Sequence, residues 1–218
     1  MGGESCNMKI AIFTLTLNRL ELTKQMMESL DKNTHIPFDH YIIDQGSTDG
    51  TTDWLKTFTY KLGKLYVFPL VKNIGINSGD AFALDKIGNR YDIIIKLDND
   101  ALIMTDSWLE KCLSVLRPKL ILSPFILGLL ENRGGVPRYA YDKENNLGFT
   151  PALGGICLIG HTKAWFEDSG GFPACLPIDY HHDDRDFCAR LREKGYKFAY
   201  KEDIYIKHLA LRNKEKLL

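Results

Sequence analysis

The sequence lacks several features that would place a protein in a special class. It has no run of roughly 18 apolar residues, so a membrane-spanning helix is not expected. The five cysteines are an odd number, and no pair has the C-x-x-C spacing of a zinc or redox site. The 28 basic and 28 acidic residues cancel, which disfavours nucleic acid as a partner held by bulk charge. These absences favour reduced thiols, and we expect a cytoplasmic protein.

Internal repeats, low-complexity tracts and a secretory leader pattern are also missing. What is present is an average globular composition, with 44% hydrophobic and 26% charged residues. A chain of 218 residues fits a single domain with a sizeable core. Met8 resembles a native start, which would make residues 1–7 an added or frayed segment.

The first half of the chain alternates short apolar runs with helical patterns. Asn18 is the expected cap of the first helix, and Ser78 opens the third. Thr51 or Thr52 is the expected cap of the second helix, which we expect to end at Phe58. This order predicts right-handed crossovers and a mainly parallel sheet, an α/β fold with a Rossmann-like first half. The expected strands are 9–15, 40–43, 65–68 and 92–97.

The second half of the chain is less regular and predicts shorter elements. Residues 120–130 are too short to span a membrane and predict a buried strand and turn. Residues 132–149 predict a hairpin or a mobile loop. The other expected elements are strands at 155–159, 198–200 and 204–206, and helices at 163–168 and 184–194.

Polar side chains follow all four strands of the first half. Ligands bind outside the carboxyl ends of the strands in an open parallel sheet. Each polar cluster alone could be a turn or a helix cap, but four clusters on one rim favour a ligand site. The clusters are Thr16 and Asn18, Asp44 with the turn after it, Lys72 with Asn73, and Asp98-Asn99-Asp100.

One of these clusters has the residue types of a metal site. Asp98 and Asp100 are separated by one residue, so an extended backbone would direct both carboxylates to one side. Two like charges so close favour a cation, and oxygen ligands suit Mg²⁺ or Mn²⁺ bound together with phosphate groups. His208 follows the last apolar run. It could complete the ligand set and favour Mn²⁺, or it could be a structural histidine.

Carboxylates also open the last expected helix, in the segment His181-His182-Asp183-Asp184-Arg185-Asp186. At least one of them is expected to be only a cap or a partner of the helix dipole, and Asp186 fits that role best. Asp183 or Asp184 could project into the site instead. A metal cluster made of these adjacent residues is disfavoured, because neighbours in sequence rarely bind one ion together.

These motifs resemble those of one family. The chain resembles the family-two glycosyltransferases, inverting enzymes of the GT-A fold that use nucleotide-activated sugars. The most specific match is Asp44-Gln45-Gly46-Ser47-Thr48-Asp49-Gly50-Thr51, which is close to the family's D-x-G-S-x-D-G-T. The other matches are Thr16-Leu17-Asn18-Arg19, Asn73-Ile74-Gly75, Leu97-Asp98-Asn99-Asp100, Gly170-Gly171-Phe172, the segment 183–190, which is similar to E-D-x-D-L-x-x-R, and His208.

The resemblance implies a single displacement that inverts the sugar. Asp184, with Asp183 as the alternative, would be the general base, and Mn²⁺ or Mg²⁺ would be bound by Asp98, Asp100 and His208. The expected donor is a UDP-sugar, and the acceptor would be a saccharide, a lipid-linked molecule or a protein. The implied nucleotide-binding residues are Thr14, Thr16, Asn18, Asp44, Lys72, Asn73, Asp98 and Asn99. The implied acceptor- or sugar-binding residues are Gly154, Gly155, Trp165 and His182.

The resemblance also divides the single domain into parts. Residues 1–100 would form the half that binds the nucleotide-sugar, 101–208 the acceptor-binding and catalytic half, and 209–218 a basic tail. Three positions depart from the family pattern. Leu15 replaces a usual proline, Asp183 replaces a usual glutamate, and Lys163 is the nearest substitute for a missing arginine.

Other functions remain open at this point. A nucleotidyltransferase would also use a parallel sheet and acidic metal ligands, but the expected Gly-rich basic loop is absent. An inactive nucleotide-sugar-binding protein and a nucleotide-sugar hydrolase are the remaining alternatives. The aromatic residues Tyr139, Tyr141 and Phe149 could support sugar rings or belong to an ordinary hairpin. The basic segment 207–216 could contact an anionic membrane or be a solvated end.

Overall fold

The structure, a computed structural model, describes residues 8–129, 136–172 and 183–209, apart from the side chain of Asp183. Its centre is a ten-stranded sheet with the order β3-β2-β1-β4-β9-β6-β10-β8-β7, in which β5 also pairs with β10. The strands are β1 (Ile10–Thr16), β2 (Phe38–Asp44), β3 (Gly63–Pro69), β4 (Ile93–Leu97), β5 (Ala101–Ile103), β6 (Leu120–Leu127), β7 (Ala140–Asp142), β8 (Leu147–Thr150), β9 (Cys157–His161) and β10 (Lys197–His208). The helices are α1 (Leu20–Asn33), α2 (Thr51–Leu55), α3 (Ile76–Ile87), α4 (Trp108–Leu113), η1 (Ala164–Asp168) and α5 (Asp183–Glu193).

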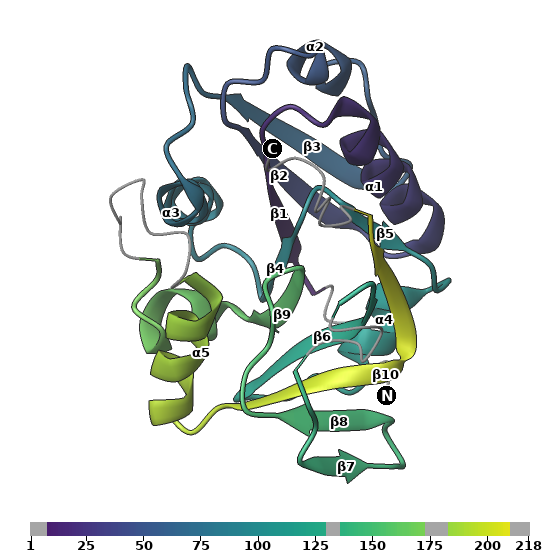
Figure 1. Ribbon diagram of the computed structural model, residues 1–218, viewed down its shortest axis with the longest axis vertical. Coiled ribbons are helices and arrows are strands. Elements are labelled where there is room, and N and C mark those ends of the chain that lie inside the picture. The colour runs from purple at the N-terminus through teal and green to yellow at the C-terminus, as the bar shows by residue number, and fades with distance from the viewer. Residues whose placement is uncertain (1–7, 130–135, 173–182, 210–218) are drawn as a thin grey trace, which may run out of the picture.

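The first four strands are parallel, as the sequence predicts. β1 pairs in parallel with β2 and β4, and β2 with β3, so their carboxyl ends meet at one edge of the sheet. The sheet becomes mixed beyond β4, because β9 is antiparallel to β4 and β6, whereas β6 and β10 are parallel. In Figure 1, α3 and α5 lie on the left of the sheet and α1 lies on the right. The α/β fold with a Rossmann-like first half is confirmed.

The apolar runs that predict the strands form the core. All five residues of β4 are buried, and Met26, Met27 and Leu30 of α1 pack within the same core. Burying one such apolar side chain contributes roughly 1.5–3 kcal/mol. Lys96 is the single charged residue among the apolar residues of β4. A buried ammonium group requires a paired charge. None of the helices that the structure describes is long and apolar enough to cross a bilayer.

The predicted cap of the first helix is wrong. Asn18 has a φ of 56°, and its Oδ1 accepts a hydrogen bond from the Thr48 backbone N at 2.8 Å. Asp49 caps α1 instead, because its Oδ2 accepts from the Leu20 backbone N at 2.9 Å. Its Oδ1 accepts from the Thr51 backbone N at 3.1 Å, at the start of α2. One carboxylate from a distant turn therefore joins the starts of two helices.

Other boundaries also differ from the predictions. α3 begins at Ile76, directly after Gly75, and not at Ser78. Thr51 is the first residue of α2 and Gly50 is its cap, so the predicted threonine cap is wrong, and the helix ends at Leu55 rather than at Phe58. The sequence patterns do not predict β5 or α4, because elements of three and six residues are too short to show a periodicity.

The second half contains the predicted hairpin, formed by β7 and β8. The predicted helix 163–168 is a single π-helical turn in which the Ser169 N–H donates to the Ala164 carbonyl. The predicted strands 198–200 and 204–206 are one strand, β10, with a register shift between Lys201 and Tyr205. A bulge of this kind interrupts the hydrophobic alternation, which explains why the sequence predicts two strands.

Candidate active site

A cleft of about 370 Å³ opens at the carboxyl ends of β1 and β4. Its walls come from the segments after β1, β2, β3 and β4, from the segment before β9 and from the start of α5. Seven of the residues predicted from the sequence line it together: Thr16, Asn73, Asp98, Asn99, Asp100, Gly155 and Asp184. The predicted rim of polar side chains thus corresponds to one cavity, as expected for a parallel sheet.

Asp44 organises the turn beside this cleft. Its side chain is fully buried, its Oδ1 accepts from the Ser47 backbone N at 3.0 Å, and its Oδ2 accepts from the Thr52 hydroxyl. Gly46 in this turn has a φ of 86°, and a Cβ there would lie 3.1 Å from the backbone of Lys72. Glycine is therefore required both by its backbone conformation and by the close approach of the next loop. A contact between Asp44 and a nucleotide base stays a prediction.

Two predicted nucleotide-binding residues support the cleft from within. The Thr14 hydroxyl donates to the Leu97 carbonyl at 2.7 Å and contacts His40 Nε2 at 2.9 Å, in the buried interior. The Asn99 amide Nδ2 donates to the hydroxyl of Thr16 at 3.1 Å and to that of Thr23 at 3.3 Å. These bonds tie the turn after β4 to β1 and α1.

Asp98 and Asp100 do not follow the predicted geometry. The strand ends at Leu97, and residues 98–100 form a turn in which the Ala101 N–H donates to the Asp98 carbonyl at 3.2 Å. The expectation of an extended backbone that directs both carboxylates to one side is therefore wrong. Both still line the cleft, but their neighbours differ. Asp100 contacts Arg19 and His208, whereas the charges of Lys96 and Asp184 shift the pKa of Asp98.

Asp100 has the surroundings of a cation ligand. Its Oδ2 lies 3.0 Å from Arg19 Nη1 and 3.4 Å from His208 Nε2. Its Oδ1 is buried and has no hydrogen-bond partner among the described residues. Such an orphaned carboxylate oxygen is costly unless something binds it, and a divalent cation would do so.

A metal ion would depend on more than these protein groups. Among the described residues, no three His, Cys, Asp or Glu side chains converge closely enough to form a full metal-binding group. Mg²⁺ and Mn²⁺ commonly use one or two protein ligands together with water and substrate phosphates. Asp100 and His208 fit that partial ligand set.

The sheet already positions His208. It is the last residue of β10 and pairs with Ala101 of β5, and the Leu209 N–H donates to the Asp100 carbonyl at 2.8 Å. The imidazole thus lies beside the Asp100 carboxylate.

Asp184 lies on another wall of the cleft, at the start of α5. Its Oδ1 lies 3.4 Å from Lys96 Nζ, which also donates to Asp80 Oδ2 at 2.9 Å. A Cβ at Gly155 would overlap the Asp184 carboxylate, so these two predicted site residues are in direct contact.

Sequence reasoning missed Lys96, Asp80 and the contact of Arg19 with Asp100. The available signal for Lys96 is a single charged residue within an apolar run, Ile93–Leu97.

The carboxylates of the cleft affect one another. Desolvation by the surrounding walls raises the pKa of Asp98 well above its ordinary value of 3.8. Lys96 opposes this shift, whereas the charges of Asp184, Asp100 and Asp80 add to it. A negatively charged ligand could enter this cleft only with additional positive charge.

Four predicted acceptor or base positions have different outcomes. Trp165 is fully buried and packs against Phe187 at a ring-centroid distance of 4.8 Å, so it supports the core under the cleft and presents no face to a sugar. A Cβ at Gly154 would meet open space. His182 and the side chain of Asp183 lie outside the described residues.

Two predicted donor residues lie on the exposed rim. Lys72 and Asn73 follow β3, and both are exposed. Asn73 Oδ1 accepts a hydrogen bond from the Gly75 backbone N at 2.8 Å, which shapes the entry to α3.

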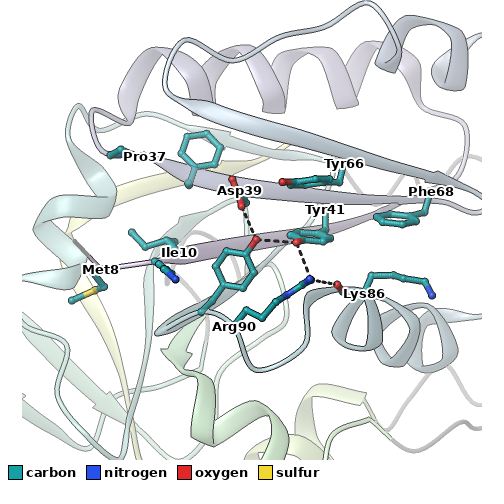
Figure 2. A pocket seen from close by; sticks show the side chains of 12 residues that line it. Met8, Ile10, Pro37, Asp39, Tyr41, Tyr66, Phe68, Lys86 and Arg90 are labelled. Atoms are coloured by element: carbon teal, nitrogen blue, oxygen red, sulfur yellow. Dashed lines mark hydrogen bonds between the residues drawn. The ribbon is translucent and has the colours of Figure 1, made fainter. Parts of the chain in front are cut away.

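A larger cavity of about 570 Å³ lies at the opposite edge, near the amino ends of β1 and β2. Its polar groups bind one another: Tyr91 donates to Asp39 at 2.6 Å, Tyr41 contacts Tyr91 at 2.9 Å, and Arg90 reaches Tyr41 at 3.5 Å. Figure 2 marks hydrogen bonds among these side chains, including those at the labelled Asp39, Tyr41 and Arg90, with dashed lines. None of the predicted site residues lines it. The smaller cleft, where several carboxylates converge, is therefore the candidate active site.

Solved structures with the same architecture are glycosyltransferases of the GT-A fold. The mannosyltransferase PcManGT from Pyrobaculum calidifontis, in complex with GDP-Man and Mn²⁺, has a TM-score of 0.72 at 18% identity, covering 96% of this chain and 59% of that one. GalNAc-T7 with UDP, GalNAc and Mn²⁺ has a TM-score of 0.73 at 13% identity, covering 95% and 45%. S. aureus TarS 1–349 with UDP-GlcNAc has a TM-score of 0.66 at 17% identity, covering 92% and 58%. At these identities the likeness shows the fold.

The family follows from the sequence comparison. Residues 11–121, just over half of the chain, match the model of glycosyl transferase family 2. The chain belongs to glycosyl transferase family 2. It is 24% identical to the O-antigen chain rhamnosyltransferase WbaN of Salmonella anatum, over 84% of this chain and 60% of that protein. The chain thus spans about 60% of the length of that curated relative.

Proposed function

We propose that the chain transfers a sugar from a nucleotide-diphospho-sugar, with UDP-sugars as the first candidates, to an acceptor hydroxyl in one metal-dependent, inverting displacement. The observation that carries the proposal is the convergence of Asp98, Asp100 and Asp184 on one cleft at the carboxyl ends of parallel strands. Membership of glycosyl transferase family 2 and the nucleotide-sugar complexes of the structural neighbours support it.

In this proposal Asp184 is the general base. It accepts the proton of the acceptor hydroxyl while that oxygen forms a bond to the anomeric carbon. The bond from the anomeric carbon to the diphosphate oxygen breaks in the same step, and the diphosphate leaves from the opposite face. One displacement inverts the configuration and requires no covalent intermediate on the protein.

The other charged residues bind and orient the donor. Asp100 and His208, with Asp98 nearby, would hold Mn²⁺ or Mg²⁺, which supplies positive charge to the departing diphosphate. Lys72 and Asn73, which are exposed, would contact the nucleotide. Arg19 adds a cation at the same end of the cleft. Residues up to about 100 therefore serve the donor, and Gly154, Gly155 and Asp184 serve the acceptor.

A thermal-shift panel tests the donor and the metal together. UDP-, GDP- and dTDP-sugars are each added with Mn²⁺ and with EDTA, because a ligand that binds only the folded state raises the melting temperature. The expected result is stabilisation by one nucleotide class, with Mn²⁺ only. Equal stabilisation in EDTA contradicts metal dependence, and no stabilisation by any donor contradicts the function.

Product analysis then separates transfer from its alternatives. The expected product is a glycoside whose anomeric configuration, measured by NMR, is opposite to that of the donor. Retained configuration contradicts a single displacement. Free sugar without a glycoside indicates a hydrolase, and donor binding without either product indicates an inactive binding protein.

A further inference from the structure

We infer that Lys96 is a positioning residue that holds the general base Asp184 over the cleft. The inference rests on the proposed function. Lys96 is in the middle of the sheet, on β4, whereas Asp184 is at the start of α5 and Asp80 is on α3. The Lys96 ammonium therefore links β4 and the helix before it, α3, to α5, whose Asp184 lies 88 residues further along the chain, and both helices lie on one side of the sheet (Figure 1).

Lys96 is buried in the middle of the sheet. Its side chain is 5% exposed, and an ammonium group in that position is strongly disfavoured without an opposite charge. Asp80 Oδ2, 2.9 Å away on a side chain that is 0% exposed, provides that charge and anchors the ammonium. Asp80 is not among the residues that line the cleft. Asp80 thus holds the lysine from the side that faces away from the cleft.

Lys96 also has a contact on the cleft side. From this anchored position, Lys96 Nζ lies 3.4 Å from Asp184 Oδ1, on a side chain that is 23% exposed. An ion pair with a fixed ammonium limits the rotation of the carboxylate more than a pair with a mobile surface lysine does. The Asp184 carboxylate is therefore the cleft-facing end of a series of ion pairs that begins at the buried Asp80.

A third contact confines Asp184 from another side. A Cβ at Gly155 would overlap both carboxylate oxygens, so only glycine leaves room for the observed arrangement. The aromatic ring of Phe172 lies 5.7 Å from Lys96 Nζ and stacks on Phe187 of α5 at a centroid distance of 5.2 Å. The first turns of α5 are thus fastened at Asp184 by charge and at Phe187 by packing.

This arrangement assigns a role to a lysine that touches no reacting atom. Proton transfer requires the base within hydrogen-bond reach of the acceptor hydroxyl, and a displacement of roughly 1 Å can cost about 100-fold in rate. Lys96 and Gly155 hold the carboxylate within that tolerance. Loss of Lys96 should reduce kcat, with a smaller effect on the affinity for the donor.

Four variants test this role against a merely structural one. Lys96→Gln removes the ammonium, and Lys96→Arg retains a cation. Because Lys96→Gln removes the ammonium beside the buried Asp80, the double variant Lys96→Gln/Asp80→Asn removes both charges and should fold more readily than the single variant. Met27→Ala, in the core of α1 far from α5, is the stability control. We measure melting temperature, kcat, acceptor KM and donor Kd for each.

The expected result is a fall in kcat of about 10- to 100-fold for Lys96→Gln and for the double variant, with partial recovery in Lys96→Arg. Donor Kd should change less than kcat, and Met27→Ala should lower the melting temperature without a comparable loss of kcat. A double variant that folds and keeps the wild-type kcat overturns the inference. So does Met27→Ala if its kcat falls as far at the same loss of stability.

A second readout does not depend on activity. Hydrogen exchange at the Phe187 and Cys188 amides reports on the first turns of α5, and the double variant should exchange faster there than the wild type. Unchanged exchange overturns the inference. If the wild type transfers no sugar but the variant exchanges faster, the proposed function fails while the positioning contact stands, so the two failures are distinguishable.

Discussion

Two cations face carboxylates in the same cleft, and their surroundings differ. Lys96 is 5% exposed and contacts the carboxylates of Asp80 and Asp184, whereas the Arg19 side chain is 53% exposed and contacts Asp100 at 3.0 Å. Both distances to the nearest carboxylate oxygen are about 3 Å, so geometry alone does not separate them. Burial does.

The difference in exposure indicates which of the two ion pairs a ligand or metal ion can replace. An exposed ion pair contributes only about 0–1 kcal/mol, because water and salt compete with it. A buried pair is hard to break, since removing one partner leaves a charge in a medium that cannot solvate it. The Arg19 side of the cleft is therefore suited to admit a metal ion and a diphosphate, and the Lys96 side is suited to hold a base in place.

The largest expected effect is at Asp184. Asp184→Asn should reduce transfer by about 10² to 10⁴, the usual range for loss of a general base, while donor Kd changes little. Asp183→Asn should have a smaller effect. Steady-state kinetics with donor calorimetry measures both quantities, and Asp186→Asn, at an exposed position on the same helix, is the control.

The ranking of these variants is informative. If Asp183→Asn is the more damaging, the base is the neighbouring carboxylate. If neither variant affects transfer, the carboxylates at the start of α5 act only on the helix dipole.

The second effect concerns the exchangeable side of the cleft. Asp100→Asn should weaken Mn²⁺-dependent donor binding by at least about tenfold, because it removes the orphaned carboxylate oxygen that a cation would bind. His208→Ala should have the same direction with a smaller size. Calorimetry with Mn²⁺ and with EDTA measures the metal-dependent part. Equal losses in both conditions would mean that these residues contact the donor directly or support the fold.

The comparison also shows what the sequence could and could not predict. The cleft was predictable, because apolar runs fix where parallel strands end and the residues after β1, β3 and β4 are polar. Gly155 was predictable only through family resemblance, and the helix-start pattern offered Asp184 only as an alternative to Asp183. The contact between Gly155 and Asp184 requires α5 to return to the segment before β9, which no local pattern specifies.

The partners within the cleft were not predictable. Asp80 and Lys96 are 16 residues apart, and neither has a local pattern that indicates an ion pair. The turn at residues 98–100 separates Asp98 from Asp100 because β5 begins immediately afterwards, and a three-residue strand leaves no periodic signal. The prediction that Asn18 caps α1 was wrong for a similar reason, since the capping carboxylate, Asp49, is 29 residues away from Leu20 in sequence.

A third prediction tests another buried polar cluster, beneath the donor side. Thr14 donates to Leu97, so its hydroxyl accepts from His40 Nε2, and His40 Nδ1 then accepts from the Tyr60 hydroxyl at 2.6 Å. Burial lowers the pKa of His40 from 6.5 to about 3. The unfolded chain therefore binds a proton that the folded chain does not. The free energy of unfolding should be highest above pH 6.5 and fall as the pH drops toward 3.

The slope of the free energy of unfolding against pH shows whether His40 is the titrating group. One such histidine contributes up to about 1.4 kcal/mol per pH unit within this window. Denaturant unfolding at several pH values between the two pKa values measures it, and His40→Leu removes the titrating group. A variant with the same slope as the wild type would assign the pH dependence to other residues.

The smallest expected effect is at Arg19, whose side chain is 53% exposed although its partner Asp100 is buried. Arg19→Ala should change the free energy of unfolding by less than about 1 kcal/mol, since water can replace the guanidinium at the exposed end of the pair. The guanidinium lies 3.0 Å from Asp100 Oδ2 and would compete with a divalent cation for the same carboxylate. Removing it should therefore strengthen Mn²⁺ binding, by at most about tenfold, because the competing interaction is worth less than about 1.4 kcal/mol. Salt should weaken the Arg19 contact in the wild type, so the advantage of the variant should shrink as ionic strength rises. Titration of Mn²⁺ at low and high salt measures this, and weaker Mn²⁺ binding in Arg19→Ala would show that the arginine supports the metal position rather than competing for it.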